Sequence, residues 1–321
     1  MIGRRQRSAE DRVFALDIGG SSVKYGLVSI QNGRARLNES IRSVPIEELT
    51  YPAVERAVRR AILALKEQGP EVPWLGVSTT GSVTPEGIVR SAGHFVDYRG
   101  VDWTKTLSNS GLSCVRVYND GFCATWAEFS DRNASQASLA HFVVGTGIGG
   151  GLVIDGSMVI GQTGTAGVLG HIKIAATSSV QCSCKRYGCV ESLAATPAMV
   201  HQWRAVSGRD GEFQDLVQAF GEADPAADDI VRAAGESLGL GVASVIATVD
   251  PGLVTLGGGV IDAFDSVGRP NLYVETAVAT ARASVFQRVA NETEIRRGRF
   301  GNSSGLLGAA LLTLNFARAN D

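Results

Sequence analysis

The sequence lacks a surplus of charge of either sign. Lysine and arginine number 30 and aspartate and glutamate 32, so the formal charge is −2 with neutral histidines. This near balance argues against a protein that binds nucleic acid or a membrane surface through electrostatics. A composition of 44% hydrophobic and 19% charged residues also excludes disorder throughout. The 321 residues are enough for two domains, each with its own core.

Long apolar runs are absent as well. Charged residues recur through positions 4–12, and Asp17 interrupts the first apolar stretch, so we expect no signal peptide. The most apolar uncharged stretches, residues 142–154 and 238–249, are shorter than the ~20 residues that span a bilayer. We therefore expect a cytoplasmic protein without a membrane partner.

Cysteine is scarce, and its five copies are an odd number in a chain with no expected export signal. Three of them, Cys182, Cys184 and Cys189, follow His171 in the pattern H-x₁₀-C-x-C-x₄-C. Metal ligation is therefore favoured over disulfides. One imidazole and three thiolates with no open position are typical of a closed structural Zn²⁺ site. The alternative, a set of free buried thiols, is disfavoured by this spacing.

Two similar hairpins organise the chain. Residues 12–16 and 23–28 are β-rich runs on either side of a glycine turn, and residues 140–144 and 152–154 flank a second turn at 145–151. Two copies of one hairpin design predict two similar α/β domains on either side of a cleft.

Strands and helices alternate around these hairpins, as expected of α/β layers. Apolar residues at helical spacing predict an amphipathic helix over residues 52–68. The other predicted elements are strands at 74–77, 114–118 and 254–256 and helices at 121–129, 228–249 and 305–318.

Residues 145–150 formally satisfy the dinucleotide-binding pattern G-x-G-x-x-G. That pattern requires a helix directly afterwards, because the pyrophosphate rests on a helix N-terminus. A predicted strand follows instead, and no G-x-x-x-x-G-K-[ST] loop is present, so the Rossmann and P-loop interpretations both fail. A hairpin turn can still cradle phosphate through successive N–H groups of positive-φ glycines. One such turn is most simply a tight hairpin, but two of them with Gly257, Gly258 and Gly259 after a strand favour nucleotide binding.

Several motifs follow one another along the chain. They are Asp17-Ile-Gly-Gly-Ser, Asn119-Asp120, residues 145–151, the His171 and cysteine segment, residues 256–260 and Gly305-Leu-Leu-Gly-Ala-Ala. Together they resemble the ROK sugar kinases, which share a nucleotide-binding fold with hexokinase, actin and the Hsp70 chaperones. The resemblance implies an α/β, two-domain actin/hexokinase-like (ribonuclease H-like) fold with an interdomain active-site cleft. It implies an N-terminal domain of residues 1–120 plus about 305–321, and a C-terminal domain of residues 121–304 with a zinc-binding segment at 164–191.

The same resemblance implies which residues bind ATP and Mg²⁺. Asp17 would orient Mg²⁺ and phosphate through water. Ser21 stands where the family usually has threonine, which keeps the hydroxyl. Besides Asp17, the implied nucleotide-binding residues are Gly19, Gly20, Ser21 and Lys24 in the first phosphate loop, Gly145, Thr146 and Gly147 in the second, and Gly257, Gly258 and Gly259 on the adenosine side.

Asn119 and Asp120 lie where a predicted strand ends and a predicted helix begins. An aspartate in that place is commonly only a helix N-cap. Phosphoryl transfer to an alcohol, however, needs a carboxylate that accepts the hydroxyl proton. The resemblance identifies Asp120 as this general base and Asn119 as a residue that binds the substrate through hydrogen bonds.

The cysteine segment is similar to the family motif C-x-C-G-x-x-G-C-x-E, with Lys185 in place of the first glycine. Zinc would fold this segment so that groups at both of its ends reach the sugar pocket. The resemblance assigns Glu191 and His171 to substrate binding. The alternative for Glu191 is an exposed acid at a helix N-terminus.

Two positions of the implied sugar pocket also depart from the family pattern. Val168 stands where the family has a glutamate that binds sugar hydroxyls near the anomeric carbon. His94 takes the position of a sugar-binding asparagine, or it is only a surface-loop histidine. An apolar Val168 would leave hydroxyls of glucose without partners. We therefore expect an ATP-dependent kinase for the primary hydroxyl (6-OH or equivalent) of a hexose-like substrate such as an amino sugar, a ketose or a cyclitol.

Other functions stay open at this stage. One is a kinase-like sugar sensor, and another is an ordinary or polyphosphate-using glucokinase. ROK repressors carry a helix-turn-helix domain ahead of the kinase-like fold, and the sixteen residues before Asp17 are too few for one, so no nucleic-acid partner is expected. The resemblance also implies a homodimer.

Overall fold

The computed structural model describes residues 10–68, 72–90, 95–133, 135–176, 180–208 and 210–320. The chain divides into two compact units. Unit 1 comprises Met1–Asp131, Ile160–Ala166 and Asn302–Asp321, and unit 2 comprises Arg132–Val159 and Gly167–Gly301.

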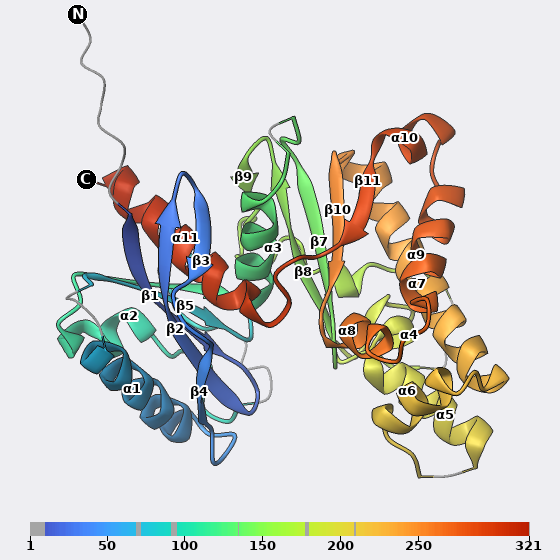
Figure 1. The fold of residues 1–321 in the computed structure, drawn as a ribbon, viewed down its shortest axis with the longest axis horizontal. Coiled ribbons are helices and arrows are strands. Elements are labelled where there is room, and N and C mark those ends of the chain that lie inside the picture. The colour runs from blue at the N-terminus through green and yellow to red at the C-terminus, as the bar shows by residue number, and fades with distance from the viewer. Residues whose placement is uncertain are drawn as a thin grey trace, which may run out of the picture. The chain divides into compact units, whose positions relative to one another are not determined.

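Unit 1 is built on a six-stranded sheet in which β1 and β2 form an antiparallel hairpin (Figure 1). β1 also pairs in parallel with β5, and β5 pairs in parallel with β6. The carboxyl ends of these three parallel strands therefore meet at one edge of the sheet. The strands are β1 Asp11–Ile18, β2 Ser22–Gln31, β3 Arg34–Leu37, β4 Arg42–Pro45, β5 Trp74–Thr79 and β6 Cys114–Asn119.

Helices cover both faces of this sheet. Phe14 and Leu16 of β1 belong to the core that α1 completes. On the other face, Gly76 makes room for α11, since a Cβ at Gly76 would lie 2.4 Å from the carbonyl oxygen of Ala309. The helices of unit 1 are α1 Tyr51–Gln68, α2 Trp103–Thr106, α3 Asp120–Ser130 and α11 Ser304–Asn320, with 3-10 turns at Ser108–Ser110 and Gly301–Ser303 next to them.

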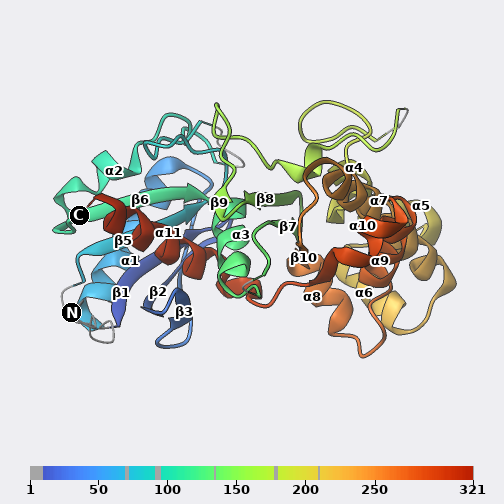
Figure 2. The same ribbon diagram turned by 90° about the horizontal axis from the view of Figure 1, so that it is seen from above.

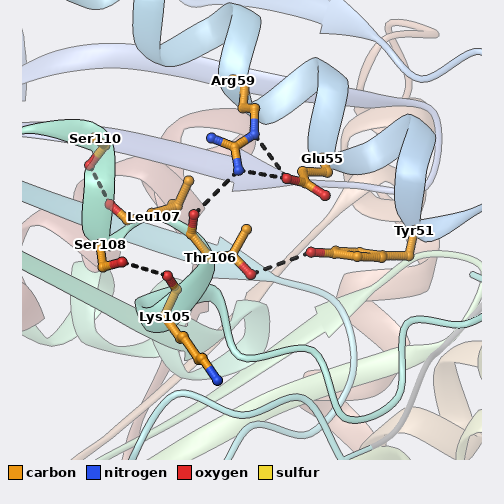
Figure 3. Close-up of polar contacts among 8 residues, drawn as sticks. All are labelled: Tyr51, Glu55, Arg59, Lys105, Thr106, Leu107, Ser108 and Ser110. Atoms are coloured by element: carbon orange, nitrogen blue, oxygen red, sulfur yellow. Dashed lines mark hydrogen bonds and ion pairs between the residues drawn. The ribbon is translucent and has the colours of Figure 1, made fainter.

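Polar contacts join α1 to the segment that precedes β6 (Figure 3). Arg59 pairs with Glu55 one turn away and donates to the carbonyl oxygen of Thr106 at 3.3 Å. The hydroxyl of Tyr51 lies 3.3 Å from Thr106 Oγ1. These contacts fix the chain just upstream of β6, the strand that ends in Asn119.

Unit 2 has a five-stranded sheet with the order β11-β10-β7-β8-β9, in which β7 and β8 form a second antiparallel hairpin. Its core lies between this sheet and the helices α5, α6, α7 and α9, which lie side by side (Figure 2). The strands are β7 Leu139–Val144, β8 Ile148–Ile154, β9 Ser157–Met158, β10 Leu253–Gly257 and β11 Glu294–Arg297. The helices are α4 Glu191–Ala194, α5 Thr196–Ser207, α6 Phe213–Gly221, α7 Pro225–Val249, α8 Gly259–Asp265, α9 Leu272–Ala283 and α10 Gln287–Glu292, with a 3-10 turn at Leu169–His171.

The helix α7 is the one helix in the described part of the chain that is long and apolar enough to cross a membrane. In its most apolar window, 61% of the residues are buried inside the protein. Gly235 and Gly239 let α9 approach closely, because a Cβ at either position would lie 2.6 Å from a carbonyl oxygen of α9. Such burial against a neighbouring helix is typical of a core helix.

The two predicted hairpins are confirmed, but the second glycine turn is shorter than the sequence predicts. β8 begins at Ile148, so only residues 145–147 form the turn and the following glycines belong to the strand. Close packing explains one of these glycines, Gly150, and also Gly170 in the neighbouring 3-10 turn. A Cβ at Gly150 would lie 2.0 Å from the carbonyl oxygen of His141, and a Cβ at Gly170 would lie 2.2 Å from that of Ile148.

Candidate functional site

Polar side chains gather where β1, β5 and β6 end. The parallel register pairs Asp17 with Ser78 and Thr79 with Asn119. Ser78 Oγ donates to Asp17 Oδ1 at 2.7 Å. Lys24, which pairs with Asp17 across the β1–β2 hairpin, places its Nζ 3.7 Å from Asp17 Oδ2. A carboxylate with one hydroxyl donor and one ammonium nearby is thus fixed at this edge of unit 1.

The next strand end places Asn119 and Asp120. Asn119 is the N-cap of α3, and its Oδ1 accepts from the backbone N–H of Phe122 at 3.2 Å. Asn119 Nδ2 donates to the carbonyl oxygen of Gly81 at 2.8 Å and to Asp120 Oδ1 at 2.9 Å. The backbone N–H of Gly121 donates to the same oxygen at 2.8 Å. Asn119 therefore supplies the cap that the sequence allowed for Asp120.

Both carboxylates of this site have raised pKa values. Burial raises the pKa of Asp17, against the hydrogen bond from Ser78 and the charge of Lys24. Desolvation by neighbouring atoms and the charge of Asp17 raise the pKa of Asp120 to about 6, against its hydrogen bonds from Gly121 and Asn119. The Asp120 side chain is open to solvent, which screens part of these interactions. A raised pKa suits a group that must accept a proton near neutral pH.

We expect activity to fall on the acid side of pH 6 if Asp120 is a general base, because its pKa of about 6 leaves it protonated there. As pH rises through that value the carboxylate forms, so kcat/KM should rise. A profile of kcat/KM between about pH 4.5 and 8 reports the ionisation in the free enzyme. An acid limb near the ordinary aspartate value of about 4 would contradict this assignment.

The first glycine turn lies between β1 and β2. Gly19 N–H donates to the carbonyl oxygen of Ser22 at 3.1 Å, and a Cβ at Gly20 would meet no heavy atom within 4 Å. Neither glycine has a positive φ, and neither do Gly145 and Gly147 of the second turn. The expected nest of positive-φ glycines is therefore wrong for both turns. The first turn instead leaves open backbone next to Asp17 and Ser21.

In unit 2 the second turn, which contains Thr146, is closed by a 2.8 Å hydrogen bond from Gly145 N–H to the carbonyl oxygen of Gly147. Gly257 ends β10, and Gly258 is the N-cap of α8 with φ 105°. A Cβ at Gly258 would lie 2.4 Å from the carbonyl oxygen of Val144. The structure thus brings residues 257–259 next to the strand end that leads into the second turn.

The four predicted metal ligands come together in unit 2. The ligand atoms of His171, Cys182, Cys184 and Cys189 all lie within 4.8 Å of one another. Cys182 Sγ is 3.4 Å from His171 Nδ1, and the sulfurs of Cys184 and Cys189 are 3.7 Å apart. Two thiolates bound at about 2.3 Å to one tetrahedral zinc lie roughly 3.8 Å apart, so this donor set fits Zn²⁺.

Lys173 supports this cluster, and sequence reasoning did not find it. Its Nζ donates to Cys189 Sγ at 3.2 Å and also to the carbonyl oxygen of Tyr187. Three thiolates and one imidazole leave a net charge of about −1 on a bound Zn²⁺, which a neighbouring ammonium offsets. No local sequence pattern reveals this contact, because it depends on the isolated β-bridge between Lys173 and Cys189, which exists only in the folded chain.

Lys185 occupies a left-handed position in the turn between two of the cysteines. Its φ is 64°, and its N–H donates to the carbonyl oxygen of Cys182 at 2.9 Å. Glycine adopts this conformation without steric penalty, which explains why glycine is usual at this position of the motif. We expect Lys185→Gly to raise the free energy of unfolding by about 1 kcal/mol. Urea unfolding of the zinc-loaded protein measures it, and an equal gain in Lys185→Ala would contradict the explanation.

Glu191 links the cysteine segment to the second glycine turn. Its Oε2 accepts from the backbone N–H of Ile148 at 3.0 Å. Its Oε1 accepts from Ser183 Oγ and, at 3.3 Å, from Cys182 Sγ. Gly147 makes room for this carboxylate, since a Cβ there would lie 2.7 Å from Glu191 Oε2. One side chain therefore contacts both the metal cluster and the start of β8.

The two implied sugar-pocket positions that depart from the family pattern are Val168 and His94. Val168 is 44% exposed and directly precedes the 3-10 turn that carries His171. His94 lies outside the described residues.

Further groups support Asp17 and β5, and sequence reasoning missed them. Thr79 Oγ1 lies 2.6 Å from the hydroxyl of Tyr98, which also accepts from Trp103 Nε1 at 2.9 Å. Burial raises the pKa of Tyr98 to about 12, so this hydroxyl stays protonated. A Cβ at Gly305 would lie 2.7 Å from Asp17 Oδ1. These neighbours come from segments far apart in the sequence, so only the folded chain reveals them.

Comparison with known proteins identifies relatives over nearly the full chain. The model of the ROK family matches residues 13–315. An N-acetylmannosamine kinase from Salmonella heidelberg is 30% identical over 312 residues, covering 93% of this chain and 97% of the relative. The crystal structure of a ROK hexokinase from Thermus thermophilus has a TM-score of 0.81 at 29% identity, covering 96% of this chain and 99% of that one. A ROK family glucokinase from Streptomyces griseus, in complex with glucose and AMPPNP, has a TM-score of 0.78 at 26% identity and covers 96% of this chain and 100% of that one.

Proposed function

The chain belongs to the ROK family and is a carbohydrate kinase, and we propose that it transfers a phosphoryl group from ATP to the primary hydroxyl of an amino sugar. The expected α/β, actin/hexokinase-like fold is confirmed by the match to ROK sugar kinases along nearly the whole chain. The observation that carries the proposed chemistry is the pair Asp17 and Asp120, with the pKa of Asp120 raised to about 6.

Asp120 is proposed as the general base. Its Oδ1 is held by two donors, Asn119 Nδ2 and the N–H of Gly121, so the side chain has one orientation relative to α3. The other oxygen can accept the proton of a substrate hydroxyl as that hydroxyl attacks phosphorus. Fixing the acceptor in this way contributes through alignment, which is most of what phosphoryl transfer requires of a protein.

We propose that Mg²⁺ and the phosphates bind in unit 1 to Asp17, to Lys24 and to the turn that contains Gly19, Gly20 and Ser21. An oxygen ligand such as Asp17 suits Mg²⁺, which when bound would neutralise charge on the transferred group. Lys24 would add a positive charge, and a ligand could approach the backbone at Gly20, where a Cβ would meet no heavy atom within 4 Å. In unit 2, the turn at 145–147 and residues 257–259 would contribute the remaining nucleotide contacts.

The cysteine cluster is proposed to hold structural Zn²⁺, because its four donors leave no open position for catalysis. His171 and Glu191 are proposed to bind the sugar as well. Glu191 already makes hydrogen bonds with both of its oxygens, so sugar hydroxyls would have to bind on its remaining lone pairs or displace one partner.

An amino sugar is favoured over glucose as substrate by two observations. The Salmonella relative and a second one from Vibrio cholerae, 30% identical over 252 residues (78% of this chain, 84% of the relative), are N-acetylmannosamine kinases. The exposed isopropyl group of Val168 can contact an acetamido methyl group, whereas it gives a hydroxyl no partner. A hexose is the second candidate, favoured by the glucose bound to the Streptomyces structure.

Substitution of Val168 with glutamate tests this assignment. We expect the ratio of kcat/KM for glucose to that for N-acetylmannosamine to rise by about tenfold or more, because a charged acceptor is restored beside the hydroxyls. Val168→Gln is the control without the charge. An unchanged ratio in Val168→Glu would show that residue 168 does not contact the sugar.

The function as a whole is tested by ADP release with MgATP on a panel of hexoses, N-acetylated and free amino sugars, ketohexoses and cyclitols. Turnover on N-acetylated amino sugars would support the proposal, and turnover on glucose alone would favour the hexose alternative. No turnover on any sugar by a zinc-loaded, folded protein would contradict it. Polyphosphate in place of ATP distinguishes the two donors.

The location and assembly belong to the same proposal. The five cysteines form no disulfide in the structure, and three of them suit a metal, which agrees with a reducing cytoplasm. A homodimer is proposed from the family, and Phe286 of unit 2, which is 85% exposed, is an apolar side chain that a second copy could cover. Light scattering of the wild type and of Phe286→Ser tests both the stoichiometry and this surface.

A further inference from the structure

Unit 1 contains a cavity that the proposed reaction does not use. It has a volume of about 320 Å³ and lies on the side of the sheet that α1 covers, where Leu65 contributes to its wall. Phe14 of β1, which is 2% exposed, and Tyr25 of β2 form an aromatic floor. Small-molecule sites begin at about 300 Å³ and combine such apolar floors with a few polar groups. The size and lining of this cavity therefore suit one small ligand.

The hydroxyl of Tyr25 gives this cavity a polar group without a partner. Tyr25 is 8% exposed and lines the cavity. Within the described part of the chain, no residue forms a hydrogen bond with it. The hydroxyl oxygen is accessible to solvent, so it can donate to or accept from a ligand. Asn38 and Ser40 also line the cavity and can donate and accept further hydrogen bonds. These groups match the hydroxyls of a polyol.

The charges on the wall favour an anion. Arg12, Arg42 and Glu39 line the cavity, which gives a net charge of +1. Arg42 is neutralised by Glu39, with its Nη2 2.7 Å from Glu39 Oε2. The acid next to Arg12 is Glu10, 3.7 Å away, and Glu10 also accepts a 2.8 Å hydrogen bond from Arg36. The guanidinium of Arg12 thus keeps donors for a phosphate, which it can bind in a bidentate manner.

We propose that this cavity binds a small phosphorylated polyol, with its ring on Phe14 and Tyr25 and its phosphate on Arg12. The sugar phosphate formed by the kinase belongs to this class, and only that identity rests on the proposed function. The strands that form the floor also carry the reaction site. Asp17 lies three residues after Phe14, and Lys24 directly precedes Tyr25. A ligand in this cavity therefore contacts the strands that position both phosphate-binding groups.

Calorimetry on the zinc-loaded full chain tests the proposal without turnover. The protein carries Asp120→Asn, and excess N-acetylmannosamine with MgADP fills the reaction site. We expect N-acetylmannosamine 6-phosphate to bind at one site per chain under these conditions. Arg12→Gln should weaken its binding by about tenfold or more, and Tyr25→Phe by about fivefold. Arg34→Gln is the matched control, because Arg34 is exposed on the same sheet but does not line the cavity.

Three results would overturn the proposal. The first is no binding of the sugar phosphate in the presence of excess sugar and MgADP. The second is equal weakening by Arg12→Gln and Arg34→Gln, which would indicate unspecific attraction of an anion. The third is equally tight binding of inorganic phosphate, because the polyol would then contribute nothing. Absence of ADP release in the kinase assay would contradict the proposed function but not this site, since the titration measures binding alone.

Discussion

Replacing Asp120 with asparagine is expected to lower kcat by a factor of about 10²–10⁴ while leaving the fold intact. Asparagine cannot accept the hydroxyl proton, so the contribution of general base catalysis is lost. The local structure should survive, because the side-chain oxygen of an asparagine can still accept from Asn119 Nδ2 and from the N–H of Gly121. Initial rates of ADP release at saturating sugar and MgATP measure the loss.

A matched substitution separates the loss of the base from the loss of a carboxylate elsewhere. Asp102 caps α2 by accepting from the N–H of Lys105 at 2.9 Å, and asparagine serves equally well as an N-cap. Asp102→Asn should therefore keep kcat within about twofold. If Asp120→Asn retained more than about a tenth of the wild-type kcat, another group would have to accept the proton. The acid limb near pH 6 should also disappear in Asp120→Asn.

The elements with a clear period or a clear turn were predictable from the sequence. The helix expected over 52–68 is α1 Tyr51–Gln68, and the helix expected over 305–318 is α11 Ser304–Asn320. Both hairpins were found because glycine turns separate their β-rich runs. The cluster of His171, Cys182, Cys184 and Cys189 was predictable because ligand type and spacing depend on the local chain alone.

Other elements were missed because their signals are not local. β3 and β4 are short edge strands, each paired only with β2, so their sequences carry little alternation. The predicted length of the second turn was wrong, because the sequence does not distinguish a glycine required by packing from a glycine required by a bend. Gly150 is needed against the carbonyl oxygen of His141, a contact that exists only after β7 and β8 have paired.

In the candidate site, too, residues could be predicted from local motifs, whereas contacts between distant segments could not. Asp17 and Asp120 could be singled out from motifs, but their mutual repulsion depends on the parallel pairing of β1, β5 and β6. Ser78 and Lys173 were missed for the same reason, since each acts across a strand pair on a residue far away in sequence. Glu191 was identified, but its contact with the N–H of Ile148 was not foreseeable from spacing.

Removal of zinc is expected to loosen the second glycine turn as well as the cysteine segment. Cys189 is fully buried, and Cys182 is 4% exposed, so the released thiols would lie in a segment with little apolar core of its own. Metal binding of this kind contributes directly to folding. Cys189→Ser should therefore lose its zinc, become sensitive to protease within residues 171–191 and lose most of its activity. Cys114 lies outside the cluster, so Cys114→Ser should keep its zinc, its resistance to protease and its activity.

Glu191 is the structural reason why the effect should reach the nucleotide. Its Oε1 accepts from Ser183 Oγ between two of the cysteines, and its Oε2 accepts from the N–H of Ile148 next to the turn at 145–147. Glu191→Gln keeps the size of the side chain but gives a weaker acceptor, so it should retain zinc and raise the dissociation constant of MgADP by about tenfold. A metal-free protein would show the same loss if the turn is held through this carboxylate. Unchanged MgADP binding in both the metal-free protein and Glu191→Gln would mean that the zinc segment folds independently of the second turn.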